Sequence, residues 1–194
     1  MNAASALERL KKGNQRFVWD LTDGNRRYRS DRRGLVSGQE PFAVILGCSD
    51  SRVPPEIAFD SGLGELFVVR VAGNVANKSG IASVEYAVSN LGTKLVLVLA
   101  HMGCGAVTAA VNGVEVGENL DHLLDYIRPA VADSEECDVD AVARLNARLS
   151  ANRLVDKSDV IRSAVESDGV SIVTAFYDLQ TGVVEFDEAN CRLT

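Results

Sequence analysis

The chain has 194 residues, of which 46% are hydrophobic, and a formal net charge of -7 at pH 7. This length and apolar content are enough to bury a sizeable core, so we expect residues 1–194 to form a single domain. The acidic balance argues against a nucleic-acid partner, because affinity for a phosphate backbone comes mainly from Lys and Arg. No stretch approaches the ~20 apolar residues of a membrane span, so we expect no membrane partner either.

Residues 1–38 are predicted to form an N-terminal arm, with a helix over residues 1–20 and a polar connection over 22–38. Its first part places Leu7, Leu10 and Phe17 among charged residues, which is the pattern of an amphipathic helix and not the apolar stretch of a signal peptide. We therefore expect a cytoplasmic protein. The rest of the arm has little apolar content, which suits packing on a neighbouring subunit. It carries a basic cluster for which ion pairs are favoured over an anion-binding patch: Arg26, Arg27, Arg29, Arg32 and Arg33.

Four apolar runs are predicted to be buried strands of a parallel sheet, near 42–47, 66–70, 95–100 and 170–176. The segment between the second and third runs has the composition of a crossover helix. Ser79 is its expected N-cap, and Gly92 lies just past its expected end.

The C-terminal part is predicted to be helical before the last parallel strand. Residues 118–168 carry three helical stretches, with breaks around 133–138 and 155–157. Residues 178–182 have the composition of a hairpin turn, so 183–186 should pair antiparallel at an edge. The expected fold class is therefore α/β, with a mixed, mostly parallel sheet of four parallel strands and one antiparallel edge strand, flanked by helices.

Three potential metal ligands follow two of these strands. Cys48 comes after the first run, and His101 and Cys104 come after the third. The carboxyl ends of parallel strands meet at one edge of a sheet, so the three side chains can come together there. Two thiolates and an imidazole suit zinc, and three protein ligands are typical of a catalytic ion with an open fourth position. The alternative is that each cysteine is only a small buried apolar residue.

Asp50 and Arg52 stand just past the first strand. Alternate residues there can point the same way, so the guanidinium can hold the carboxylate in a bidentate pair. Without a metal nearby, the same pair would be a structural salt bridge that closes the turn before Pro54 and Pro55.

The run Cys-Ser-Asp-Ser-Arg, followed about fifty residues later by His-x-x-Cys-Gly, resembles the signature of the β-class carbonic anhydrases. Further segments resemble that family in the same order: Gly38-Gln39, 64–70, 72–74, 84–88 and Gly182. The resemblance implies one Zn2+ per chain. It also implies a lyase that hydrates CO2 reversibly to bicarbonate and a proton through zinc-bound hydroxide.

The resemblance also assigns roles to residues around the metal. Asp50 would orient the hydroxide, and Arg52 would keep Asp50 ionised and off the metal. Gln39 would donate a hydrogen bond to substrate, with help from the backbone N–H of Gly105. The aromatic side chains of Phe67 and Tyr86, from a partner subunit, would line the pocket. The alternative is that Phe67 is an ordinary strand residue and Tyr86 an ordinary helix residue. The implied assembly is a homodimer or a homotetramer.

The family divides into chains with an always open zinc site and chains gated by bicarbonate, whose side pocket contains a Trp, an Arg and a Tyr. Arg70 and Tyr86 match two of these, but Ile45 stands at the Trp position, and Gln39 is typical of the open, plant-like type. We therefore expect the open type.

Two other functions remain compatible with the same residues. The first is hydrolysis of carbonyl sulfide or carbon disulfide at the same zinc site. The second is a zinc-binding or redox module without catalysis, although such a module would need neither Asp50 nor Gln39. Cys137 and Cys191 are expected to be free thiols, with a disulfide between them as the alternative.

Overall fold

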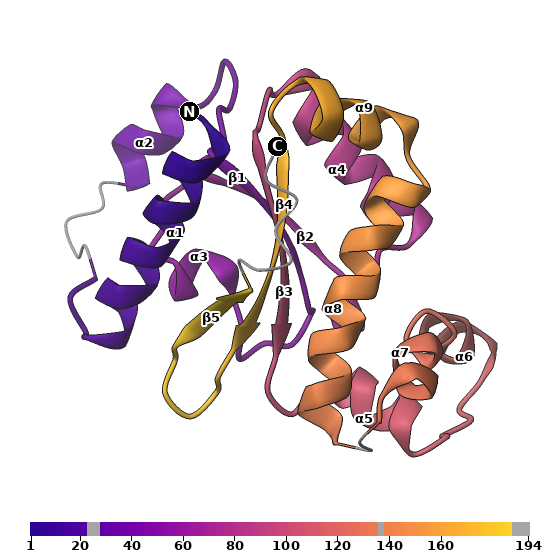
Figure 1. Ribbon diagram of the computed structural model, residues 1–194. Coiled ribbons are helices and arrows are strands. Elements are labelled where there is room, and N and C mark those ends of the chain that lie inside the picture. Colours follow the sequence, from indigo (N-terminus) through magenta and orange to yellow (C-terminus); the bar gives the residue numbers. More distant parts are fainter. Residues whose placement is uncertain (23–27, 136–137, 188–194) are drawn as a thin grey trace.

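The computed structural model describes residues 1–22, 28–135 and 138–187, and it has a central sheet between two layers of helices (Figure 1). Cys137, Cys191, Arg26 and Arg27 lie outside the described residues. The strand order is β2-β1-β3-β4-β5. The strands are β1 (Ala43–Gly47), β2 (Leu66–Arg70), β3 (Leu95–His101), β4 (Ser171–Tyr177) and β5 (Val184–Asp187). The first four run parallel and β5 pairs antiparallel to β4, which confirms the predicted fold class.

The helices divide between the two faces of the sheet. One face is covered by α4, α8 and α9, and the other by α1 and α3 (Figure 1). The helical elements are α1 (Ala3–Val18), α2 (Tyr28–Gly34), α3 (Pro55–Ala58), the 3-10 turn η1 (Ala72–Asn74), α4 (Lys78–Asn90), α5 (Gly105–Val111), α6 (Glu118–Leu124), α7 (Arg128–Asp133), α8 (Val139–Asp156) and α9 (Asp159–Ser167). Within the described ranges, no helix is both long and apolar enough to cross a membrane.

The core has two halves because successive strand residues face opposite sides of the sheet. Val44 and Val96 pack toward α4 and α8, whereas Ile45 and Leu97 pack toward α1 and α3. Both faces are covered, so the strands are continuous apolar runs in the sequence, and this is why their positions could be predicted.

Helix α1 belongs to the core of its own chain. Leu7 and Leu10 are buried against the sheet. Asn14, which is 5% exposed, donates to the carbonyl oxygens of Ala58 and Gly182 and accepts from the N–H of Val184. The part of the expected arm that is left for a neighbouring subunit is therefore the stretch after α1.

Three local features differ from the sequence predictions. Helix α4 is capped by Asn77, whose Oδ1 accepts from the Gly80 N–H at 2.8 Å, and Ser79 already lies inside the helix. Residues 118–168 contain four helices, because α6 ends before a new helix that has Pro129 in its first turn, where proline is tolerated. The polar segment before β1 contains α2, which no apolar periodicity signalled.

Candidate metal centre

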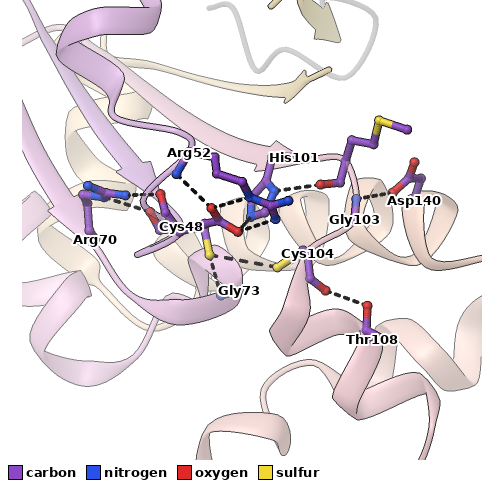
Figure 2. Close-up of polar contacts among 11 residues, drawn as sticks. Cys48, Arg52, Arg70, Gly73, His101, Gly103, Cys104, Thr108 and Asp140 are labelled. Carbon is purple, nitrogen blue, oxygen red and sulfur yellow. Dashed lines mark hydrogen bonds and ion pairs between the residues drawn. The ribbon is translucent and has the colours of Figure 1, made fainter. Parts of the chain in front are cut away.

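The three predicted ligands meet at the carboxyl edge of the sheet (Figure 2). Cys48 directly follows β1, His101 ends β3, and Cys104 precedes the first residue of α5. Strands β1 and β3 are hydrogen-bonded neighbours, which closes the gap between segments far apart in sequence. All three side chains are buried, and their ligand atoms lie within 4.8 Å of one another.

The ring of His101 is oriented for metal binding. Its Nδ1 lies 2.9 Å from the carbonyl oxygen of Met102, so Nδ1 carries the proton and Nε2 presents a lone pair. Among the described residues Nε2 has no hydrogen-bond partner, although it is buried. A buried polar atom without a partner is costly. A metal ion beside the two sulfur atoms would satisfy this nitrogen, so the residues present fit a zinc ion.

The two cysteine side chains are hydrogen-bonded to each other. Their sulfur atoms lie 4.0 Å apart, and the hydrogen bond from Cys104 is the main cause that lowers the pKa of Cys48 to about 4, against the opposite effect of burial. The pKa of Cys104 is raised because its proton is held by the neighbouring thiolate. Burial acts to lower the pKa of His101, but the Cys48 thiolate raises it overall. The lowered pKa of Cys48 favours its thiolate form, which attracts a cation.

The bidentate pair predicted between Asp50 and Arg52 is present beside this cluster. Arg52 Nε lies 2.9 Å from Asp50 Oδ1, Nη2 lies 2.7 Å from Oδ2, and the Arg52 backbone N–H also donates to Oδ1 at 3.0 Å. These bonds hold the pKa of Asp50 well below its usual range, so the carboxylate is ionised at neutral pH. Its Oδ2 is 3.9 Å from His101 Nε2, at the rim of the ligand cluster.

Two contacts that the sequence reasoning missed hold the Cys48 loop. Arg70, at the end of β2, donates to the carbonyl oxygens of Cys48 and Asp50 at 2.8 and 2.5 Å. The Gly73 N–H lies 3.3 Å from Cys48 Sγ. Gly73 has φ +66°, and a Cβ there would meet Ile127 Cδ1 at 2.7 Å, so glycine allows this close approach. The glycine itself was the only sequence signal for the second contact.

The residues expected to touch substrate lie elsewhere in the chain. Gln39 is exposed and precedes β1, at the end of that strand opposite to Cys48. Phe67 is the second residue of β2, and its ring lies 6.1 Å from the ring of Tyr86, which is 49% exposed on α4. Gly105, the first residue of α5, is the one expected substrate contact that directly adjoins a ligand.

Comparisons with known proteins agree on one family. A family model described as carbonic anhydrase matches residues 43–184. Carbonic anhydrase 2 of Mycobacterium tuberculosis is 36% identical over 188 residues, which cover 93% of this chain and 91% of that protein. A chain from the crystal structures of two tetrameric β-carbonic anhydrases of Sordaria macrospora superposes with a TM-score of 0.74 and 25% identity, covering 82% of this chain and 89% of that one. A β-carbonic anhydrase of Aspergillus fumigatus gives 0.72 and 27%, with coverage of 96% and 90%.

Proposed function

The chain belongs to the β-carbonic anhydrase family and catalyses the reversible hydration of CO2, and we propose that Cys48, His101 and Cys104 hold one zinc ion per chain for this reaction. The observation that carries the proposal is the unpartnered, buried Nε2 of His101 beside two sulfur atoms 4.0 Å apart. Zinc bound there would lower the pKa of a water molecule and so supply a nucleophile near neutral pH.

Asp50 would orient that nucleophile. Its carboxylate is fixed by Arg52 and offers an acceptor oxygen 3.9 Å from His101 Nε2. An acceptor in this place takes a hydrogen bond from the attacking water and turns a lone pair away from Asp50 and toward the substrate. Arg52 keeps the carboxylate ionised, since its hydrogen bonds stabilise the charged form.

We propose that the site is of the open, plant-like type. Both oxygens of Asp50 are engaged by Arg52, which favours a carboxylate that stays off the metal. Ile45 is fully buried in the apolar half of the core formed with α1 and α3, and it offers no hydrogen bond to an anion. Arg70 is committed to two backbone carbonyl groups. These three features leave few hydrogen-bond donors for a regulatory bicarbonate.

We also propose that the working unit is a homodimer or a homotetramer whose pocket is completed by a partner's Gln39, Phe67 and Tyr86. Strand β2 forms an edge of the described sheet, with the exposed Tyr86 ring beside it. Exposed apolar side chains follow α1, with Val36 at 84% and Trp19 at 60%. The relatives from Sordaria macrospora are described as tetrameric, which supports self-association.

A mixture of two inactive variants tests this shared pocket. Cys48→Ser removes a ligand and Gln39→Ala removes a substrate contact. Random pairing of the two chains makes half of the dimers hybrids, and each hybrid has one intact site, so about a quarter of wild-type activity should return. If both residues act within one chain, mixing restores nothing, and the proposed assembly is wrong.

Zinc content and CO2 hydration, measured on one sample, test the function itself. We expect one zinc per chain and rapid hydration. Zinc without hydration, but with hydrolysis of carbonyl sulfide or carbon disulfide, would favour the related hydrolases. A protein that binds no zinc would instead point to a redox module that uses Cys48 and Cys104. Both site cysteines are outside any disulfide, and zinc binding requires them to be reduced, so a reducing cytoplasm is the compartment that we propose.

A further inference from the structure

We propose that Asp140 is a positioning residue for the metal centre and acts on His101 through one peptide group. The proposal rests on the ligand assignment above. Asp140 lies in the first turn of α8 and, among the described residues, forms no hydrogen bond or ion pair with any of the three proposed ligands. Its side chain reaches the loop between His101 and Cys104, where Oδ1 accepts from the Gly103 N–H at 2.8 Å (Figure 2).

The bonded peptide group links Asp140 to the imidazole. The N–H of Gly103 and the carbonyl of Met102 belong to the same planar peptide unit. That carbonyl is 2.9 Å from His101 Nδ1. A chain of two hydrogen bonds therefore runs from the Asp140 carboxylate through the peptide to the ring. Histidine ligands often donate their second N–H to a carboxylate, which fixes the ring and raises the basicity of the ligand nitrogen. Here the Asp140 carboxylate reaches the imidazole indirectly, through the peptide group between Met102 and Gly103.

The charge of Asp140 has no other evident use. In the part of the chain that the structure describes, no ion pair involves Asp140, whereas two other residues of α8, Arg144 and Arg148, both form ion pairs with β5. A charged acceptor makes a stronger hydrogen bond than a neutral one. Gly103 has φ +59°, so the loop passes through a conformation that few residues adopt, and an external anchor helps to keep it there.

Helix α8 is a fixed support for this anchor. It packs on β3, α5 and η1, three elements that carry or adjoin the metal-binding loops. The buried side chain of Asn146 donates to the Gly73 carbonyl oxygen at 2.8 Å, and the N–H of the same glycine faces Cys48 Sγ. Asp140 and Asn146 therefore anchor both loops to the same helix. This shared support fixes the position of His101 relative to Cys48.

The rate at which the zinc-loaded protein loses its metal to an excess of chelator tests the proposal. Loss of a partner that orients a ligand typically weakens metal binding by about 10- to 100-fold, so we expect Asp140→Ala to release zinc faster by a factor in that range. Asp140→Asn should restore part of the retention, because its amide oxygen can still accept from Gly103 but carries no charge. Amide hydrogen exchange at Gly103 should rise in the alanine variant and fall back in the asparagine variant.

Asp138→Ala is the matched control. Asp138 is the N-cap of α8 and accepts from the Ala141 N–H, so its loss weakens the helix start without touching the loop. If Asp140→Ala releases zinc no faster than Asp138→Ala while wild-type protein retains it, Asp140 is only a helix-terminal acid and the proposal fails. If wild-type protein holds no zinc at all, the ligand assignment fails as well, and the two failures are thus distinguished.

Discussion

Replacing Asp50 by Asn separates orientation of the nucleophile from metal binding. The amide oxygen can keep the place of Oδ1, where it accepts from the Arg52 backbone N–H and Nε. The amide nitrogen then stands where Oδ2 was, opposite Arg52 Nη2 at 2.7 Å and 3.9 Å from His101 Nε2. A donor replaces an acceptor at the rim of the cluster, so a water there loses the group that orients it.

The size of the effect follows from the loss of a charged hydrogen-bond acceptor. A hydrogen bond to a charged acceptor contributes about 1.5–3 kcal/mol, and the variant removes one such acceptor from the rim of the cluster. Each 1.36 kcal/mol corresponds to about a tenfold change in rate, so we expect kcat to fall by about 10- to 10²-fold. Zinc should remain bound at one ion per chain, because Asp50 is not among the three ligands.

Stopped-flow CO2 hydration from pH 7 to 9, with zinc analysis of each sample, measures both quantities. Asp178→Asn is the matched control, because the Asp178 carboxylate also accepts from the backbone, here from the N–H groups of Gln180 and Thr181, but lies in the hairpin before β5. The control should keep its turnover. Wild-type turnover in Asp50→Asn across this pH range would refute the orienting role.

Three further predictions follow from the same geometry. Cys48→Ser should lose most of its zinc and essentially all activity, and elemental analysis that finds full metal with full activity would contradict the ligand assignment. Gly73→Ala should destabilise folding by about 1–2 kcal/mol in denaturant titrations, because alanine at φ +66° is strained and its Cβ would meet Ile127. The depressed pKa of Asp50 means that its pairing with Arg52 stabilises the fold above the unfolded pKa of about 3.9 and is lost only as pH falls through the lower folded value. An NMR titration should therefore find the Asp50 carboxyl ionised at pH 5, and a midpoint above 5 would overturn this.

The parts of the molecule that could be predicted are those whose residue pattern lies within one short segment of the sequence. The parallel strands are unbroken apolar runs because both faces of the sheet are covered, and each prediction lies within about one residue of the observed bounds. The proposed metal ligands follow those strands at the edge where α/β folds bind small molecules. Arg52 is two residues from Asp50, so their pairing could also be inferred from spacing.

The contacts that were missed connect segments with no local pattern in common. Arg70 reaches back 22 residues to Cys48, and Asp140 reaches back 37 to Gly103. In sequence, Asp140 is an ordinary acid at a helix start, and only the packing of α8 on β3 gives it a second role. The packing of α1 on its own chain could not be predicted for the same reason. Nothing in the sequence around Asn14 indicates that it bonds to Gly182, which is 168 residues away.

Selection among small substrates cannot come from the metal cluster alone. The proposed ligand set and the proposed orienting pair of Asp50 and Arg52 would serve CO2, carbonyl sulfide or carbon disulfide equally, since each presents an electrophilic carbon to the same nucleophile. The side chains expected to touch the substrate are Gln39, Phe67 and Tyr86, and within one chain they lie on segments other than those that carry the ligands. If a partner supplies them, the width of the pocket is fixed where two subunits meet. Substitutions at that interface should then change the ratio of CO2 to carbonyl sulfide turnover while leaving zinc content constant, and substitutions at Asp50 should lower both rates together.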